Sequence, residues 1–311
     1  MSDSRGGHQG GGRRRGGGGR GGFRREQRQV EFQQNQPINV DRPNKGPISK
    51  EVQDRFLGFQ QELDVRHDKY EKLVKCSRDI TIESKRAIFL LHRVVSAWSS
   101  PTESENLLQE GENRLAAIRT DHWSRIGQEL EGEDPYLYIR AYSPGLQEYI
   151  EAATFAHYLR AGTLLSWSDI RSSLSDLPAK EGDQMSRPTT IEVPLIDYLS
   201  GVADLTGELM RAAINSIAAG NQIRPLEICA FLTSVYGGFS LFPVSMSSRD
   251  WSTKMRTFRQ SLAKVENVCY ILKLRGTEVP DYMLAEVVTV DGASFQAADI
   301  PDTHVECFDV Y

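Results

Sequence analysis

Residues 49–100 read SKEVQDRFLGFQQELDVRHDKYEKLVKCSRDITIESKRAIFLLHRVVSAWSS, without a proline and with a single glycine, Gly58. Proline and glycine are the residues that most often interrupt a helix, so their scarcity favours a long one. Apolar residues recur at the spacing of one helical face over many turns. We therefore predict one very long helix here, with a bend near Thr81. The apolar positions are Phe56, Phe59, Leu63, Tyr70, Leu73, Val74, Ile80, Ile88, Leu91 and Val95.

Prolines mark the starts of most of the later helices. The pairs Ser100-Pro101, Asp134-Pro135 and Ser143-Pro144 each join a good N-cap residue to a proline at the first helical position. Glycine ends helices, as expected at Gly220 and Gly276. The later helices are predicted at about 101–130, 135–142, 144–160, 166–174, 194–220, 225–241 and 248–276.

These helices predict an all-α bundle with several long, nearly parallel members. Residues 175–191 are polar and contain two prolines and a glycine, so we expect a loop. Residues 287–290 have the composition of a short, isolated strand.

The chain divides into three regions by composition. Residues 1–47 form a Gly/Arg-rich leader, which we expect to be disordered because it has too little apolar surface to offset the entropy of ordering. Residues 48–290 form the helical domain, and residues 291–311 a loose tail. The first 25 residues hold seven arginines and one acid, while the whole chain carries −5, so residues 26–311 carry −11. An acidic body binds nucleic acid poorly alone, which indicates another class of substrate or a basic partner.

Composition also excludes several classes of protein. The chain is 39% apolar, enough for a core. It has no apolar run of the roughly 20 residues that a membrane span needs, and no signal peptide follows the basic residues at its start. Its four cysteines lack CxxC spacing, which favours reduced thiols over disulfides or zinc.

Four carboxylates on two predicted helices suggest the chemistry. Glu148 and Glu151 lie in GLQEYIEAATF (145–155), and Asp204 and Glu208 lie in GVADLTGELMR (201–211). Residues three or four apart share a helical face, so each segment directs two acids at one patch. If the two helices pack face to face, the acids converge and either bind a divalent cation or repel one another strongly.

Each helix also has a structural interpretation. Asp204 and Glu208 would line the solvated face of an amphipathic helix. Glu148 and Glu151 lie on a helix that is apolar on both sides, so they need a partner. That partner is either an Arg or Lys from elsewhere or a cation bridging to the Asp204 patch, and both alternatives remain open.

The sequence lacks the common catalytic motifs HExxH, GxSxG and GxxxxGK[ST]. His67, His92 and His157 lie on predicted helices, where a single histidine is usually a packed or surface residue. Lys85 and Arg86 are candidates for phosphate contact, although a salt-bridged surface is the simpler interpretation. With oxygen ligands alone, Mg²⁺ or Mn²⁺ is favoured over Zn²⁺.

Four segments together resemble the translin family, and within it the X-factor subunits. The similarity covers about residues 55–290 and leaves the leader and the last twenty or so residues outside. The segments are FQQELDVRHDKYEKLVKCSRDITIESKRAIFLLHR (59–93), GLQEYIEAATF (145–155), DYLSGVADLTGELMR (197–211) and SLAKVENVCYILKLRGTEVPDYMLAE (261–286).

The resemblance implies a bundle of about seven helices that pairs with translin in a hollow hetero-oligomer, the component three promoter of RISC. It implies a Mg²⁺-dependent endoribonuclease acting on single-stranded RNA, including passenger-strand fragments of small interfering RNA and transfer-RNA processing fragments. The X-factor subunit would carry the active site, and translin would contribute RNA binding. The family's acidic residues fall on Glu148, Glu151, Asp204 and Glu208. We expect action in the cytoplasm and the nucleus.

On this hypothesis the four acids hold one or two Mg²⁺ ions, with Glu151 and Glu208 as direct ligands and Mn²⁺ as a substitute. Glu148 or Asp204 would orient the attacking water or take its proton. The alternative is a non-catalytic subunit that stabilises translin and modulates its binding of single-stranded nucleic acid. A di-metal oxidase would need Glu-x-x-His pairs on two helices, and the sequence has none.

Overall fold

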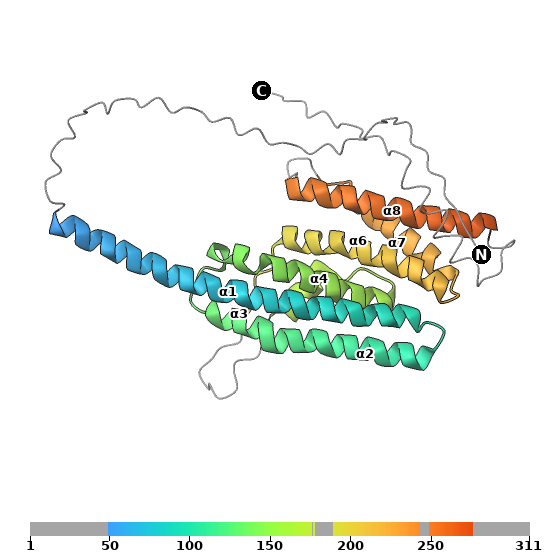
Figure 1. The fold of residues 1–311 in the computed structure, drawn as a ribbon, viewed down its shortest axis with the longest axis horizontal. Coiled ribbons are helices and arrows are strands. Elements are labelled where there is room, and N and C mark those ends of the chain that lie inside the picture. The colour runs from blue at the N-terminus through green and yellow to red at the C-terminus, as the bar shows by residue number, and fades with distance from the viewer. Residues whose placement is uncertain (1–48, 176, 178–188, 243–248, 276–311) are drawn as a thin grey trace, which may run out of the picture. The chain divides into compact units, whose positions relative to one another are not determined.

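The computed structural model describes residues 49–175, 177, 189–242 and 249–275. In these ranges the chain is helical, and the only pairing of the β type is an isolated bridge between Leu177 and Thr189. The predicted all-α bundle is confirmed (Figure 1). The leader, the strand expected at 287–290 and the tail lie outside the described residues, so their predicted states stay predictions.

The first helix, α1, runs from Lys50 to Ser96, so the predicted long helix is confirmed, while the bend expected near Thr81 stays a prediction. Residues 50–55 of α1 belong to a separate unit, and the described residues from Phe56 onward form the bundle. Buried residues of α1 begin at Leu73. The apolar side chains between Phe56 and Val65 are therefore exposed, although the sequence pattern alone suggests a core stripe, and Tyr70 is the first to pack partly against the core.

The second predicted helix is three elements in sequence: α2 (Pro101–Ala117), a π-helix η1 (Ile118–Trp123) and α3 (Ser124–Glu129). Ser100 occupies the N-cap position with extended backbone, but its side chain makes no capping hydrogen bond. Proline at the first position is therefore the feature that fixes this start.

The helix predicted to begin at Pro144 begins earlier, and that prediction was wrong. Residues 135–137 form a 3₁₀ turn, η2 (Pro135–Leu137), and α4 then runs from Ile139 to Ala161 with Pro144 inside it. Next to the proline, the Gly145 N–H donates to Ser77 Oγ of α1 at 3.0 Å. A side chain on Gly145 would lie 2.6 Å from the Ser77 carbonyl oxygen, so α1 approaches α4 closely enough to satisfy the backbone around the proline.

The remaining helices begin and end close to the predicted positions. They are α5 (Trp167–Ser173), α6 (Leu195–Ala218), α7 (Ile223–Phe239) and α8 (Arg249–Arg275). Ser166 Oγ caps α5 through the Asp169 N–H at 3.1 Å. Pro225 is the third residue of α7, and the Asn221 side chain caps that helix instead. Ser248 and Gly276, the predicted limits of the last helix, lie outside the described residues.

Helices α4 and α6 occupy the centre of the bundle. Helix α4 packs against α2 and α6, and α6 packs against α4, α7 and α8 (Figure 1). Both faces of α4 are buried, as its sequence predicted. Gly201 allows the close approach of α6, because a Cβ there would lie 2.8 Å from both the Gln147 carbonyl oxygen and Ile150 Cβ. This close contact sets the distance between the two helix faces that carry the acids. In the described ranges, no helix is both long and apolar enough to cross a membrane.

Candidate active site

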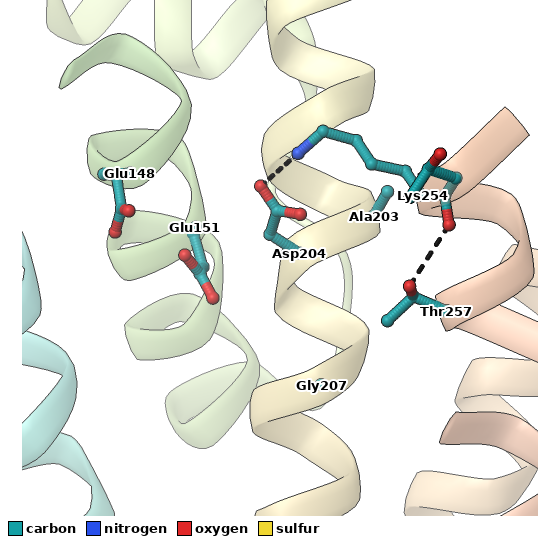
Figure 2. A pocket seen from close by; sticks show the side chains of 8 residues that line it. Glu148, Glu151, Ala203, Asp204, Gly207, Lys254 and Thr257 are labelled. Carbon is teal, nitrogen blue, oxygen red and sulfur yellow. Dashed lines mark hydrogen bonds and ion pairs between the residues drawn. The ribbon is translucent and has the colours of Figure 1, made fainter. Parts of the chain in front are cut away.

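Three of the four acids line one pocket between α4, α6 and α8. Glu148 and Glu151 of α4 face Asp204 of α6, and Lys254 of α8 closes the far side (Figure 2). The pocket has a volume of about 400 Å³, which leaves room for a hydrated cation, since each water takes roughly 30 Å³. We call it the acid pocket. Glu208 lies one helical turn beyond Asp204 on α6 and does not line it.

Glu151 is the unusual member of the group. Its residue is 8% exposed, and no described residue offers its carboxyl group a hydrogen bond or an ion pair. Burial, followed by the charges of Asp204, Glu148 and Glu208, raises the pKa of Glu151 to about 8, although Lys254 opposes the shift. A buried acid of this kind is costly to ionise and is stabilised by any cation that reaches it.

The other three acids each have a cationic or imidazole partner. Glu148 pairs with Lys85 of α1 at 3.0 Å, and Asp204 pairs with Lys254. These interactions come from helices on opposite sides of the acid pocket. The hydrogen bond that Lys85 donates to Glu148, followed by the charge of that acid, raises the pKa of Lys85 despite partial burial.

Glu208 is held by His92 of α1. His92 Nε2 lies 2.5 Å from Glu208 Oε2, and Arg211 Nη1 lies 3.1 Å from the same oxygen. Burial alone would raise the pKa of Glu208, but the hydrogen bond and charge of His92, together with Arg211, outweigh burial and lower it. The imidazole also packs against Phe155, with ring centroids 5.0 Å apart. Glu208 is therefore fixed as a carboxylate.

A divalent cation fits the chemistry of these residues but not their present rotamers. Among the described residues, no three His, Cys, Asp or Glu side chains stand together as a ready-made metal site. The reason is that Glu148, Asp204 and Glu208 are turned toward their own partners. The donor set is nonetheless all oxygen, as Mg²⁺ prefers, and Glu151 is a buried carboxyl without a partner in the described ranges. Asp204 and Glu148 would have to turn from their lysines to join it.

Sequence signals for the partners of the acids are weak. His92 is one of three helical histidines expected to be packed or on the surface, yet it is the one that holds Glu208. Of the other two, His67 pairs with exposed Glu71 at 3.2 Å and His157 bonds the Thr163 hydroxyl at 3.0 Å. Neither lines the acid pocket.

The cations near the pocket are also hard to foresee from the sequence. Lys85 is a candidate for phosphate contact by its sequence, whereas in the structure it pairs with Glu148. Arg86 pairs with Glu83 at 2.5 Å, which agrees with the simpler surface interpretation. Lys254 carries no sequence signal at all, because its partner Asp204 lies fifty residues earlier and on another helix.

Comparison with known proteins identifies the family to which the chain belongs. Residues 68–276 match the description "Translin family". The chain belongs to the translin family. The matched region includes α4, α6 and α8, and so all residues of the acid pocket.

Individual relatives agree with membership of the translin family. The chain is 46% identical to translin-associated protein X of Mus musculus over 82% of this chain and 90% of that protein. It is 31% identical to the translin-associated protein X homolog of Schizosaccharomyces pombe, over 76% and 95%. It is 26% identical to translin of Pongo abelii, over 72% and 94%. The similarity is therefore greater to these X-type members than to translin itself.

Proposed function

We propose that this chain is the catalytic subunit of a Mg²⁺-dependent endoribonuclease that cleaves single-stranded RNA in a hetero-oligomer with translin. The observation that carries the proposal is Glu151, a buried carboxyl that no described residue pairs with, beside two further acids. The similarity to translin-associated protein X, whose name joins it to translin, supports the partner. The acidic body of the chain supports it too, because a partner must then supply much of the RNA affinity.

The four acids Glu148, Glu151, Asp204 and Glu208 would together hold one or two Mg²⁺ ions, with Glu151 and Glu208 as the principal ligands, and Mn²⁺ can take the same oxygen ligands. A bound cation of this kind lowers the pKa of a water molecule and polarises a phosphate oxygen. Asp204, which pairs with Lys254 in the structure, would orient the attacking water or accept its proton once released from the lysine. Glu148 is the alternative acceptor. Cleavage that does not use the 2′-hydroxyl would leave a 5′-phosphate on the product.

The proposed substrates follow the family resemblance: passenger-strand fragments of small interfering RNA and transfer-RNA processing fragments. Activity on them would support RISC activation, and the chain would act in both cytoplasm and nucleus. None of the described elements around the acid pocket forms a base-reading motif, so we expect weak sequence preference.

The direct test compares two variants of the full chain, each co-expressed with translin. Glu151→Ala should abolish cleavage of single-stranded RNA in Mg²⁺ while the complex still assembles, and EDTA should abolish cleavage by the unaltered chain. Glu110→Ala is the matched control, since Glu110 is an exposed acid of α2 that pairs with Arg114 at 3.2 Å. Equal rates for the Glu151 variant and the control would move the chemistry elsewhere.

A second function has one observation in its favour. Glu148, Asp204 and Glu208 already have partners, which is what structural acids have. The chain would then be a non-catalytic subunit that stabilises translin and modulates its binding of single-stranded nucleic acid. In that case Glu151→Ala would leave cleavage intact, and charge-neutral changes of the paired acids would weaken assembly.

A further inference from the structure

The exposed side of α8 beside the acid pocket carries a row of cations. Thr253 and Thr257 of α8 line the pocket. Arg249 lies four residues before Thr253, and Lys264 lies seven residues after Thr257, so both share their side of the helix. Arg256 is within about 60° of Thr253 around the axis. We call Arg249, Arg256 and Lys264, all exposed, the basic face of α8.

Some exposed arginines elsewhere in the bundle are paired with an acid one helical turn away. Arg66 pairs with Glu62 at 2.7 Å, and Arg114 pairs with Glu110 at 3.2 Å. Within the described ranges, no ion pair joins any residue of the basic face of α8 to an acid. These charges are therefore available to an anion from outside the chain.

The local charge also departs from that of the body. Between Arg249 and Lys264 the sequence has five cations and a single acid, Asp250, whereas residues 26–311 together carry −11. A positive segment on an acidic body attracts an extended anion to that segment in particular. The position of this segment at the rim of the acid pocket makes the phosphodiester backbone the fitting ligand.

We propose that the basic face of α8 binds the backbone of single-stranded RNA and leads the strand into the acid pocket; this role rests on the proposed nuclease function. From Arg249 to Lys264 the helix rises roughly 22 Å, a length that several nucleotides cover. Lys254, at the pocket itself, is the innermost cation of the path. Its Nζ pairs with Asp204, and it contacts the phosphate when Asp204 turns to a cation.

Binding without cleavage tests the basic face directly. The probe is a fluorescein-labelled oligouridine, with Ca²⁺ in place of Mg²⁺, and the protein is the full chain co-expressed with translin. The double variant R256Q/K264Q should bind roughly tenfold more weakly at low salt, and the slope of log K against log salt should fall by roughly 0.7 for each phosphate that the variant no longer neutralises. Arg259→Gln is the matched control, because Arg259 is exposed on α8 but points about 120° away from Thr253.

Crosslinking separates this chain's contribution from that of translin. Gln260 is exposed and lies between Arg256 and Lys264, so a photoreactive benzoylphenylalanine at position 260 should crosslink the oligouridine to this chain. The same group at position 259 should not. Crosslinking of position 260 to the translin chain instead would make this face a protein interface and overturn the proposal.

The two proposals fail in different ways. If R256Q/K264Q binds RNA as the unaltered chain does, with the same salt slope, the basic face is not the RNA path even where Glu151→Ala abolishes cleavage. If R256Q/K264Q weakens binding while Glu151→Ala still cleaves, the path stands and the placement of the chemistry is wrong.

Discussion

Lys254 of α8 forms an ion pair with Asp204 of α6 across the acid pocket (Figure 2). The lysine thus occupies the side of the pocket opposite Glu151, where a divalent cation would compete with it for the Asp204 carboxylate. Lys254 and a divalent cation would compete for Asp204, so removal of the lysine should strengthen binding of the metal ion.

Lys254→Met should therefore increase the affinity for Mn²⁺, measured by isothermal titration calorimetry on the complex with translin. One charge at about 4 Å in a watery site is worth about 1 kcal/mol, so we expect a gain of roughly fivefold. Lys264→Met removes the same charge from an exposed position of the same helix and should leave Mn²⁺ binding nearly unchanged. An unchanged affinity in Lys254→Met would show that Asp204 is not a ligand.

Glu151 should make the folded chain less stable as the pH rises. Its pKa is about 8 in the folded chain against an ordinary value of 4.5, so between these pH values the folded chain holds a proton that the unfolded chain has released. Stability then falls through this window, because the folded state binds more protons. Glu151→Gln lacks the titration and should be more stable than the unaltered chain at pH 8, on the order of a few kcal/mol, since each pKa unit is worth about 1.4 kcal/mol.

The measurement is the melting temperature of both proteins from pH 5 to pH 8.5 in EDTA. The gap between the two curves should widen with pH and narrow when Mg²⁺ is added, because the cation takes over the role of the proton at Glu151. Parallel curves would mean that the Glu151 carboxyl is solvated or paired in solution.

Gly201 and Gly207 of α6 should respond to alanine in opposite directions. At Gly201 a Cβ would lie 2.8 Å from the Gln147 carbonyl oxygen, whereas at Gly207 no described atom lies within 4 Å. Gly201→Ala should lower the free energy of unfolding by about 1–3 kcal/mol through overpacking. Gly207→Ala should raise it by about 0.5–1 kcal/mol, because alanine is the better helix former.

Urea unfolding of the two variants provides the comparison, and Mn²⁺ binding adds a second reading. Because Gly201 sets the distance between α4 and α6, its substitution should also weaken Mn²⁺ binding. If Gly201→Ala is as stable as Gly207→Ala, α4 and α6 have room to separate, and their packing at Gly201 is less tight than the structure indicates.

His92→Ala should raise the pKa of Glu208, because the hydrogen bond from His92 is the main influence holding it down against burial. Arg211→Ala removes the weaker of the two partners and should raise the same pKa less. Glutamate-specific carbon-13 labelling reports both values. A larger shift in Arg211→Ala than in His92→Ala would reverse the assigned order of the two interactions.

Most of the helices could be predicted from the sequence because apolar spacing and N-cap residues are local signals. The prediction failed at Pro144, where the compensating group, Ser77 Oγ, belongs to a helix nearly seventy residues earlier. It also missed the π-helical turn at Ile118–Trp123, since an extra residue in a turn leaves the apolar pattern almost unchanged.

Some features of the site could be predicted from local sequence, and others depend on contacts between distant helices. Spacing alone shows that Glu148 and Glu151 share a face of their helix. It cannot show which cation meets which acid, because Lys254 and His92 reach the acids only after α8 and α1 have packed. The choice between a cationic side chain and a bridging metal as partner of Glu148 and Glu151 could therefore not be made from the sequence, because it depends on tertiary contacts. Within the described residues, three acids have a side-chain partner while Glu151 does not.

All four acids stand within helices rather than on loops, and Gly201 locks the two helices together. Amide hydrogens in such central turns exchange with solvent only when a large part of a domain opens. Deuterium uptake around Glu151 and Asp204 should therefore be among the slowest in the bundle. The distances between the acids on α4 and α6 cannot change without opening the bundle, so the acids would keep their spacing for as long as the protein remains folded.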